Sequence, residues 1–183
     1  MPSLQQVMPL TEKIQSAIRD VPDFPKPGIL FKDITPIFLD AKLCSEITDA
    51  FCRSFSKAKP DAIIGIESRG FLFGMLMASW LNIPFIMVRK AGKLPSKTVS
   101  HAYDLEYGSA IIEVHDDVIK KGWNIVIHDD LLATGGTAGA AAEIVKKCGA
   151  NIAGFTFVVE LEFLKGKEKL INYSNNIQCL VQY

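Results

Sequence analysis

Three short apolar segments in the 183-residue chain constrain its fold most. They read DAIIGI (61–66), PFIMV (84–88) and NIVIH (124–128), and none of them alternates apolar with polar residues. A strand with one face in water shows such alternation, whereas a strand covered on both faces reads as a continuous apolar run. The three runs therefore predict buried strands of a mostly parallel sheet.

Helical segments separate these strands along the chain. We expect helices at 11–19, 42–57, 70–81 and 137–148, and a further strand at 152–160. Thr11 is the expected cap of the first helix. Strands that alternate with helices are typical of the α/β class, in which helices flank a central, mainly parallel sheet. Because no linker, repeat or composition break interrupts the sequence, we expect one domain over residues 1–183.

An uncharged stretch at residues 71–88 has about the length of a membrane span. Asn82 and Pro84 interrupt it, and the residue before a proline disfavours the helical conformation. The stretch is therefore expected to form a buried helix, a short turn and a buried strand. The N-terminus has no cationic segment followed by an apolar one, so no signal peptide is expected.

The charge and the cysteines narrow the function classes. Twenty Lys and Arg residues balance twenty Asp and Glu residues, so neither nucleic acid nor an anionic membrane is expected as the main partner. The four cysteines show no zinc-ligand spacing. They are typical of buried free thiols, which indicates a reducing cytoplasmic location.

Polar segments follow the three predicted strands. They read ESRG (67–70), RKAGK (89–93) and DDLLATGGT (129–137). Ligands of parallel α/β sheets bind beyond the carboxyl ends of the strands. One cleft is therefore expected to combine cationic side chains, carboxylates and backbone N–H donors.

The segment ATGGT (133–137) leads directly into a predicted helix. Its glycines allow successive N–H groups to point into one concavity, and the helix N-terminus adds positive potential, which suits a phosphate monoester. No lysine follows the second glycine, so the P-loop pattern is absent, and no GxGxxG occurs in the chain.

Asp129 and Asp130 come immediately before that loop. If the strand continues through them, their side chains point to opposite faces of the sheet. They can accept hydrogen bonds from the two hydroxyls of a ribose whose phosphate lies in the loop. They can also approach Mg²⁺, directly or through water. A solvated acidic turn is the simpler alternative.

Five blocks of the sequence carry a resemblance to a known family. They are DFPKPGILFKDITP (23–36), IESRGFLFG (66–74), VRKAGKLP (88–95), YDLEYG (103–108) and DDLLATGGTA (129–138). In this order they resemble the type I phosphoribosyltransferases, and most closely those that use adenine. The resemblance implies a small hood from about 23–36 and 94–108, Mg²⁺ as cofactor and a homodimer. It also implies the reaction of adenine with phosphoribosyl pyrophosphate to give AMP and pyrophosphate.

The resemblance also implies residue roles. The 5′-phosphate is assigned to Ala133, Thr134, Gly135, Gly136 and Thr137, and the ribose and metal to Asp129 and Asp130. The pyrophosphate is assigned to Glu67, Ser68, Arg69, Gly70, Arg89, Lys90 and Lys93, within a loop that often holds a non-proline cis peptide. The catalytic residues are Glu106, as acid or base near the adenine N7, and Arg69. Tyr107 belongs to the hood, and the adenine pocket to Leu30, Phe31 and Lys32.

A loop and a histidine have none of the residue roles that the resemblance implies. Residues 94–102 show no clear periodicity and are expected to form a mobile loop that closes over the cleft. Family members usually carry an aliphatic residue before the two acids, where this chain has His128. We expect this imidazole to be tolerated at the end of the sheet, although it could hydrogen-bond a neighbouring carboxylate.

Three alternatives stay open at this point. The chain could be a non-catalytic regulator that binds a phosphoribosyl ligand, although no DNA-binding segment is visible. It could be a phosphoacceptor receiver, in which the Thr-Gly-Gly-Thr segment has no role. It could also perform the same chemistry on another purine.

Overall fold

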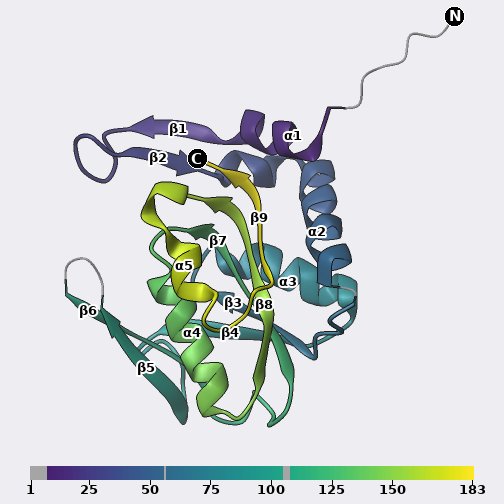
Figure 1. Ribbon diagram of the computed structural model, residues 1–183, viewed down its shortest axis with the longest axis vertical. Helices are drawn as coiled ribbons and strands as arrows, with labels where there is room; N and C mark the ends of the chain where they lie inside the picture. Colours follow the sequence, from purple (N-terminus) through teal and green to yellow (C-terminus); the bar gives the residue numbers. More distant parts are fainter. Residues whose placement is uncertain (1–7, 56, 105–107) are drawn as a thin grey trace, which may run out of the picture. The chain divides into compact units, whose positions relative to one another are not determined.

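The computed structural model describes residues 8–55, 57–104 and 108–183 (Figure 1). The chain forms two compact units, Met1–Ile47 and Thr48–Tyr183, and the boundary falls inside helix α2 (Ala41–Phe55). The expected single domain stays a prediction.

Unit 1 contains a helix and a two-stranded antiparallel ribbon before α2. Its elements are α1 (Leu10–Ala17), β1 (Arg19–Pro22), β2 (Leu30–Asp33) and the 3-10 helix η1 (Thr35–Leu39). Helix α1 ends two residues earlier than expected because Arg19 already pairs with Asp33 in the ribbon. Pro9, not Thr11, occupies the cap position.

Unit 2 is built on a seven-stranded sheet in the order β5-β6-β4-β3-β7-β8-β9. The strands are β3 (Ala62–Ile66), β4 (Phe85–Lys90), β5 (Thr98–Asp104), β6 (Ser109–His115), β7 (Asn124–Leu132), β8 (Asn151–Glu160) and β9 (Ile177–Gln182). The five strands from β4 to β9 in this order pair in parallel, and β5 and β6 add an antiparallel edge. The predicted, mainly parallel sheet is confirmed.

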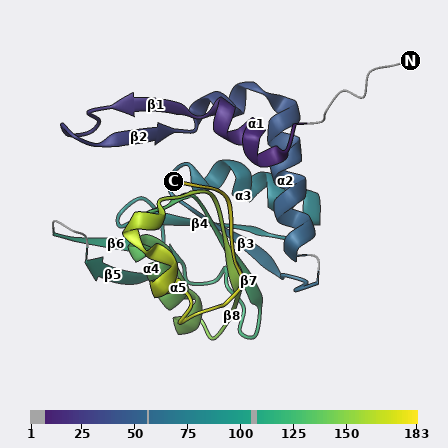
Figure 2. The same cartoon turned by 45° about the horizontal axis from the view of Figure 1, so that its top comes forward.

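Helices α3 (Gly70–Leu81) and α4 (Gly136–Lys147) cover opposite faces of this sheet, as Figures 1 and 2 show. Ile64 of β3 belongs to the core cluster that includes Ala141 of α4. The next residue, Gly65, faces the other way, and a Cβ atom there would lie 2.8 Å from the Gly70 carbonyl oxygen. The short elements η2 (Glu162–Leu164) and α5 (Gly166–Leu170) follow β8.

The uncharged stretch 71–88 divides as expected. Helix α3 ends at Leu81, Asn82 takes the left-handed conformation with φ 55°, and β4 begins at Phe85. None of the helices in the described part of the chain has the length and apolar composition needed to span a membrane.

The prediction of a mobile loop at residues 94–102 needs correction. Residues 98–102 belong to β5, which pairs with β6 along its whole length. Partly buried and exposed residues alternate from Val99 to Asp104, because this edge strand has one face in water. Because such a strand contains no continuous apolar run, the apolar pattern of the sequence does not predict it.

Candidate active site

The segment from Ala133 to Thr137 forms a small cavity between β7 and α4. Gly135 takes the left-handed conformation, with φ 75°, at the cap position of α4, and no side chain caps the helix. The first N–H groups of a helix lack intrahelical partners and carry positive partial charge. The cavity, of about 70 Å³, is also lined by Asp129, Leu132 and Phe157. This geometry suits a small anion.

Asp129 and Asp130 lie on β7, which continues through both of them, so their side chains point to opposite faces as predicted. Asp129 lines the cavity at the loop. Asp130 is buried, and its Oδ2 accepts a hydrogen bond of 2.5 Å from Arg69 Nε. Burial first, and then the charge of Asp130, raise the pKa of the Asp129 carboxyl well above its ordinary value. A cation at Asp129 would therefore favour its ionised form.

Arg69 reaches Asp130 because α3 begins very close to β7. A Cβ atom on Gly70 would lie 2.8 Å from the His128 carbonyl oxygen and 3.0 Å from Asp129 Oδ1. Only glycine allows this approach without a shift of the backbone. The Glu67–Ser68 peptide bond just before them is cis, as is common in the pyrophosphate loop of the family this chain resembles.

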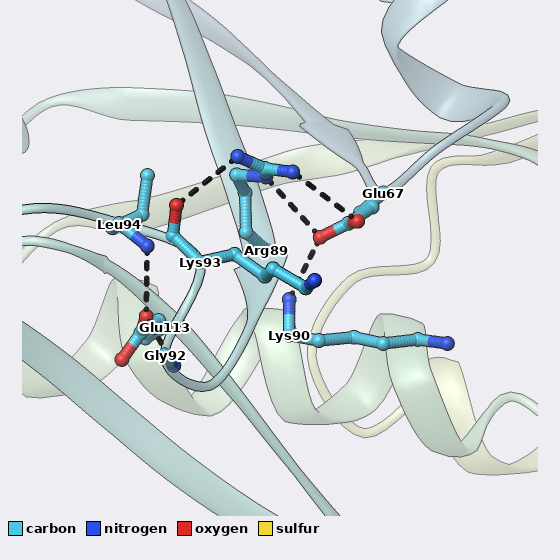
Figure 3. Close-up of polar contacts among 7 residues, drawn as sticks. All are labelled: Glu67, Arg89, Lys90, Gly92, Lys93, Leu94 and Glu113. Carbon is cyan, nitrogen blue, oxygen red and sulfur yellow. Dashed lines mark hydrogen bonds and ion pairs between the residues drawn. The ribbon is translucent and has the colours of Figure 1, made fainter.

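Glu67 binds the last two residues of β4 (Figure 3). Its carboxylate accepts hydrogen bonds from Arg89 Nε at 3.2 Å, from Arg89 Nη2 at 3.4 Å and from the Lys90 N–H at 3.0 Å. The Lys90 N–H, and then Arg89, hold the pKa of Glu67 below its ordinary range, against the effect of burial. Glu67 is thus an anion that orients the Arg89 guanidinium and holds the backbone of Lys90.

Glu113 of β6 supports the turn that follows β4 from the other side (Figure 3). Its Oε1 accepts hydrogen bonds from the N–H groups of Gly92, at 2.9 Å, and Leu94, at 3.3 Å. The carboxylate is buried, and Thr98 donates to its Oε2 at 3.2 Å. Sequence reasoning missed this residue, although a carboxylate inside the apolar run IIEV is a signal of a bound partner.

Tyr103 of β5 contacts the cavity loop and was also missed. Its hydroxyl lies 3.1 Å from Thr137 Oγ1, and its ring lies beside Gly136. The antiparallel edge of the sheet therefore reaches the predicted phosphate site.

His128 does not contact either carboxylate with its ring. It is fully buried, its Nδ1 lies 2.8 Å from Thr156 Oγ1, and the edges of Phe51 and Phe73 pack near it. Burial lowers the pKa of His128 to about 3, so the imidazole is neutral near pH 7. The expected tolerance of this imidazole stays a prediction.

The predicted adenine residues lie on β2, in unit 1. Lys32 Nζ pairs with Asp20 at 2.7 Å, and the Phe31 ring packs edge-on against Phe24 at 5.2 Å. Their role stays a prediction because it depends on the placement of unit 1 beside unit 2. Glu106 and Tyr107 lie outside the described residues.

A bound metal would have few protein ligands. Among the described residues, no three His, Cys, Asp or Glu side chains gather into a metal-binding group. Mg²⁺ commonly uses one or two carboxylates together with substrate oxygens and water. Asp129, which lines the cavity, fits that pattern, whereas Asp130 points to the opposite face of the sheet, is held by Arg69 and would take part only through water.

Comparison with known proteins places the chain in a family. The sequence model of the phosphoribosyl transferase domain matches residues 39–178. The chain belongs to the phosphoribosyltransferase family. Among its curated relatives, the adenine phosphoribosyltransferase of Cytophaga hutchinsonii is 48% identical over 95% of this chain and 96% of its own length.

Solved structures agree with this membership. Adenine phosphoribosyltransferase from Thermoanaerobacter pseudethanolicus superposes with a TM-score of 0.90, at 44% identity over 94% of this chain and 99% of that chain. The Saccharomyces cerevisiae enzyme, in complex with D-2,5-dideoxy-2,5-imino-altritol 1,6-bisphosphate and adenine, gives 0.88 at 42% identity, over 93% and 98%.

Proposed function

We propose that this chain transfers the 5-phosphoribosyl group from phosphoribosyl pyrophosphate to adenine, which gives AMP and pyrophosphate. The observation that carries the proposal is the cavity at the N-terminus of α4, with Asp129 at its rim and Asp130 held by Arg69. One helix end can hold the 5′-phosphate while the acids meet the ribose hydroxyls of the same molecule. The relatives named above support adenine as the acceptor.

The chemistry follows from this arrangement. A bond forms between adenine N9 and the ribose C1′, while the bond from C1′ to the pyrophosphate oxygen breaks and the N9 proton is lost. Arg89, Lys90 and Lys93 stabilise the negative charge that develops on the pyrophosphate. Arg69 can contact the same oxygens through its guanidinium, and Glu106 exchanges a proton with the base.

Mg²⁺ belongs to the proposal as the cofactor. When bound, it neutralises part of the charge of phosphoribosyl pyrophosphate, and Asp129 and Asp130 would hold it directly or through water. Burial and the neighbouring Asp130 raise the pKa of Asp129, and a bound cation would favour the ionised form of this carboxyl.

A homodimer is proposed from an exposed apolar stripe on α3. Leu72, Met75, Leu76 and Trp80 occupy one helix face at spacings of three and four residues, and each is 43–52% exposed. Met87 and Ile111 lie on the same side of the sheet and are exposed as well, since their neighbours Val88 and Ile112 belong to the core cluster with α4. Exposed apolar patches of this kind commonly mark protein interfaces.

Light scattering after gel filtration tests the dimer. Leu76→Glu should give a monomer, whereas Phe163→Glu, at another exposed apolar residue, should leave the mass unchanged. A cytoplasmic location completes the proposal. The four cysteines are free thiols, which is typical of a reducing compartment.

Formation of AMP tests the function. The purified protein, with adenine, phosphoribosyl pyrophosphate and Mg²⁺, should produce AMP and pyrophosphate in equal amounts. Binding of phosphoribosyl pyrophosphate without turnover would support the regulator instead.

A further inference from the structure

The phosphate-binding loop lies directly against a short element that follows β8. A Cβ atom on Gly166, the first residue of α5, would lie only 2.3 Å from the Ala133 carbonyl oxygen and 2.8 Å from the Leu132 side chain. A Cβ atom on Gly135 would lie 2.7 Å from the Gly166 carbonyl oxygen. The two segments therefore touch backbone to backbone, and the loop cannot keep its shape if α5 moves towards it.

An ion pair between a half-exposed lysine and a buried carboxylate fixes the position of α5. Lys167 Nζ lies 2.5 Å from Glu160 Oε2 at the end of β8, and the Glu160 side chain is only 4% exposed. Gln182 of β9 donates a second hydrogen bond to the same oxygen at 2.9 Å. Although burial opposes it, the bonds from Lys167 and Gln182 hold the pKa of Glu160 below its ordinary value.

The pair is also linked to the strand that carries the two acids. Glu160 lies opposite Leu132 in the β7–β8 register, and the Leu161 N–H donates to the Leu132 carbonyl oxygen at 2.9 Å. Leu132 is the residue immediately before the loop. The chain of contacts thus runs from Lys167 through Glu160 to β7, and from Gly166 directly to Ala133 and Gly135.

We infer that Gly166 and the Glu160–Lys167 pair are positioning residues for the phosphate loop, and that they set the affinity for the 5′-phosphate of the substrate. The inference rests on the proposed function for the identity of that phosphate. None of these three residues lines the cavity, so they act through the backbone of residues 133–135.

Lys167→Met tests the inference, because it removes the ammonium group and leaves a buried carboxylate without its cation. We expect the KM for phosphoribosyl pyrophosphate to rise about tenfold while the KM for adenine changes less than twofold. The double variant Glu160→Gln/Lys167→Met removes the buried charge as well, and should return the KM to within about threefold of the wild-type value.

Gly166→Ala tests the backbone contact and should raise the KM for phosphoribosyl pyrophosphate at least as much as Lys167→Met. Glu168→Gln is the matched control, since it breaks the exposed Lys165–Glu168 pair of the same segment and should change nothing.

Calorimetric titration with ribose 5-phosphate separates this inference from the proposed function. If the wild type binds it but makes no AMP, the proposed function fails, and the ratio of dissociation constants still tests the positioning role. Equal constants for wild type and Lys167→Met would overturn the positioning role, as would a loss of kcat with no change of KM. If the wild type forms AMP but does not bind ribose 5-phosphate, the proposed function stands and the positioning role for the 5′-phosphate is overturned.

Discussion

The buried imidazole of His128 makes the stability of this protein depend on pH in a defined way. Its pKa in the folded state is about 3, because burial disfavours the charged ring. In the unfolded chain its pKa is about 6.5. Between these values the unfolded state binds a proton that the folded state rejects, so stability rises with pH through this window and levels off above about 6.5.

The size of the effect follows from the unfolded pKa. Between pH 7 and pH 5 the folded protein keeps His128 neutral while the unfolded chain becomes protonated, which costs about 2 kcal/mol of unfolding free energy. The value is insensitive to the folded pKa as long as that pKa lies well below 5. The magnitude can therefore be checked without knowing the folded pKa closely.

Urea unfolding of the wild type and of His128→Val at pH 7 and pH 5 measures the contribution of His128 to the pH dependence of the unfolding free energy. The variant loses the Thr156 hydrogen bond at every pH, so only the change of the difference between pH 7 and pH 5 is diagnostic. The raised pKa of Asp129 acts in both proteins and cancels, and a chelator keeps metal from that carboxyl. We expect the difference to shift by about 2 kcal/mol in favour of the variant at pH 5. Parallel losses of stability in the two proteins would refute the reasoning.

Three further substitutions test other parts of the account. Asp130→Asn removes the charge that Arg69 binds, and should lower kcat/KM for phosphoribosyl pyrophosphate roughly 10²–10³-fold in steady-state assays, with the circular dichroism spectrum unchanged. Glu106→Gln should lower kcat by about 10²–10⁴-fold and leave adenine binding nearly intact; the reverse pattern would make Glu106 a pocket residue. Gly74→Ala places a methyl group 2.8 Å from the Phe85 ring and should lower the unfolding free energy by about 1–3 kcal/mol in urea titrations, whereas an unchanged midpoint would contradict the close packing of α3 on β4.

Much of the fold could be predicted from the sequence because β3 and β7 are buried on both faces, whereas β4 has the same apolar pattern but leaves Met87 exposed. The runs at β3, β4 and β7 carry no polar alternation, and the helix α3 between the first two of them is apolar on nearly all sides. Strands β5 and β6 could not be found in the same way. They form the edge of the sheet, where Ser100 and Ala102 face water, and Glu113 interrupts an apolar run with a carboxylate.

The site could be predicted only where its residues lie in one segment. The loop at 133–137 lies close behind Asp129 and Asp130 in the chain, so the sequence alone predicts a site for a phosphate and a ribose. Tyr103 contacts Thr137, and Glu113 binds the N–H groups of Gly92 and Leu94. Lys167 acts through the backbone of another segment, and no local sequence pattern predicts any of these contacts. The role of Glu106 was predicted from the family resemblance alone, and this residue lies outside the described part of the chain.

The specificity for the base is the most direct test of the central claim. Adenine, hypoxanthine and guanine should be offered together to the purified protein with phosphoribosyl pyrophosphate and Mg²⁺, and the three mononucleotide products separated and quantified. The account predicts AMP as the overwhelming product and a kcat/KM for adenine far above those for the two oxopurines. Preferential formation of either of the other nucleotides would contradict it.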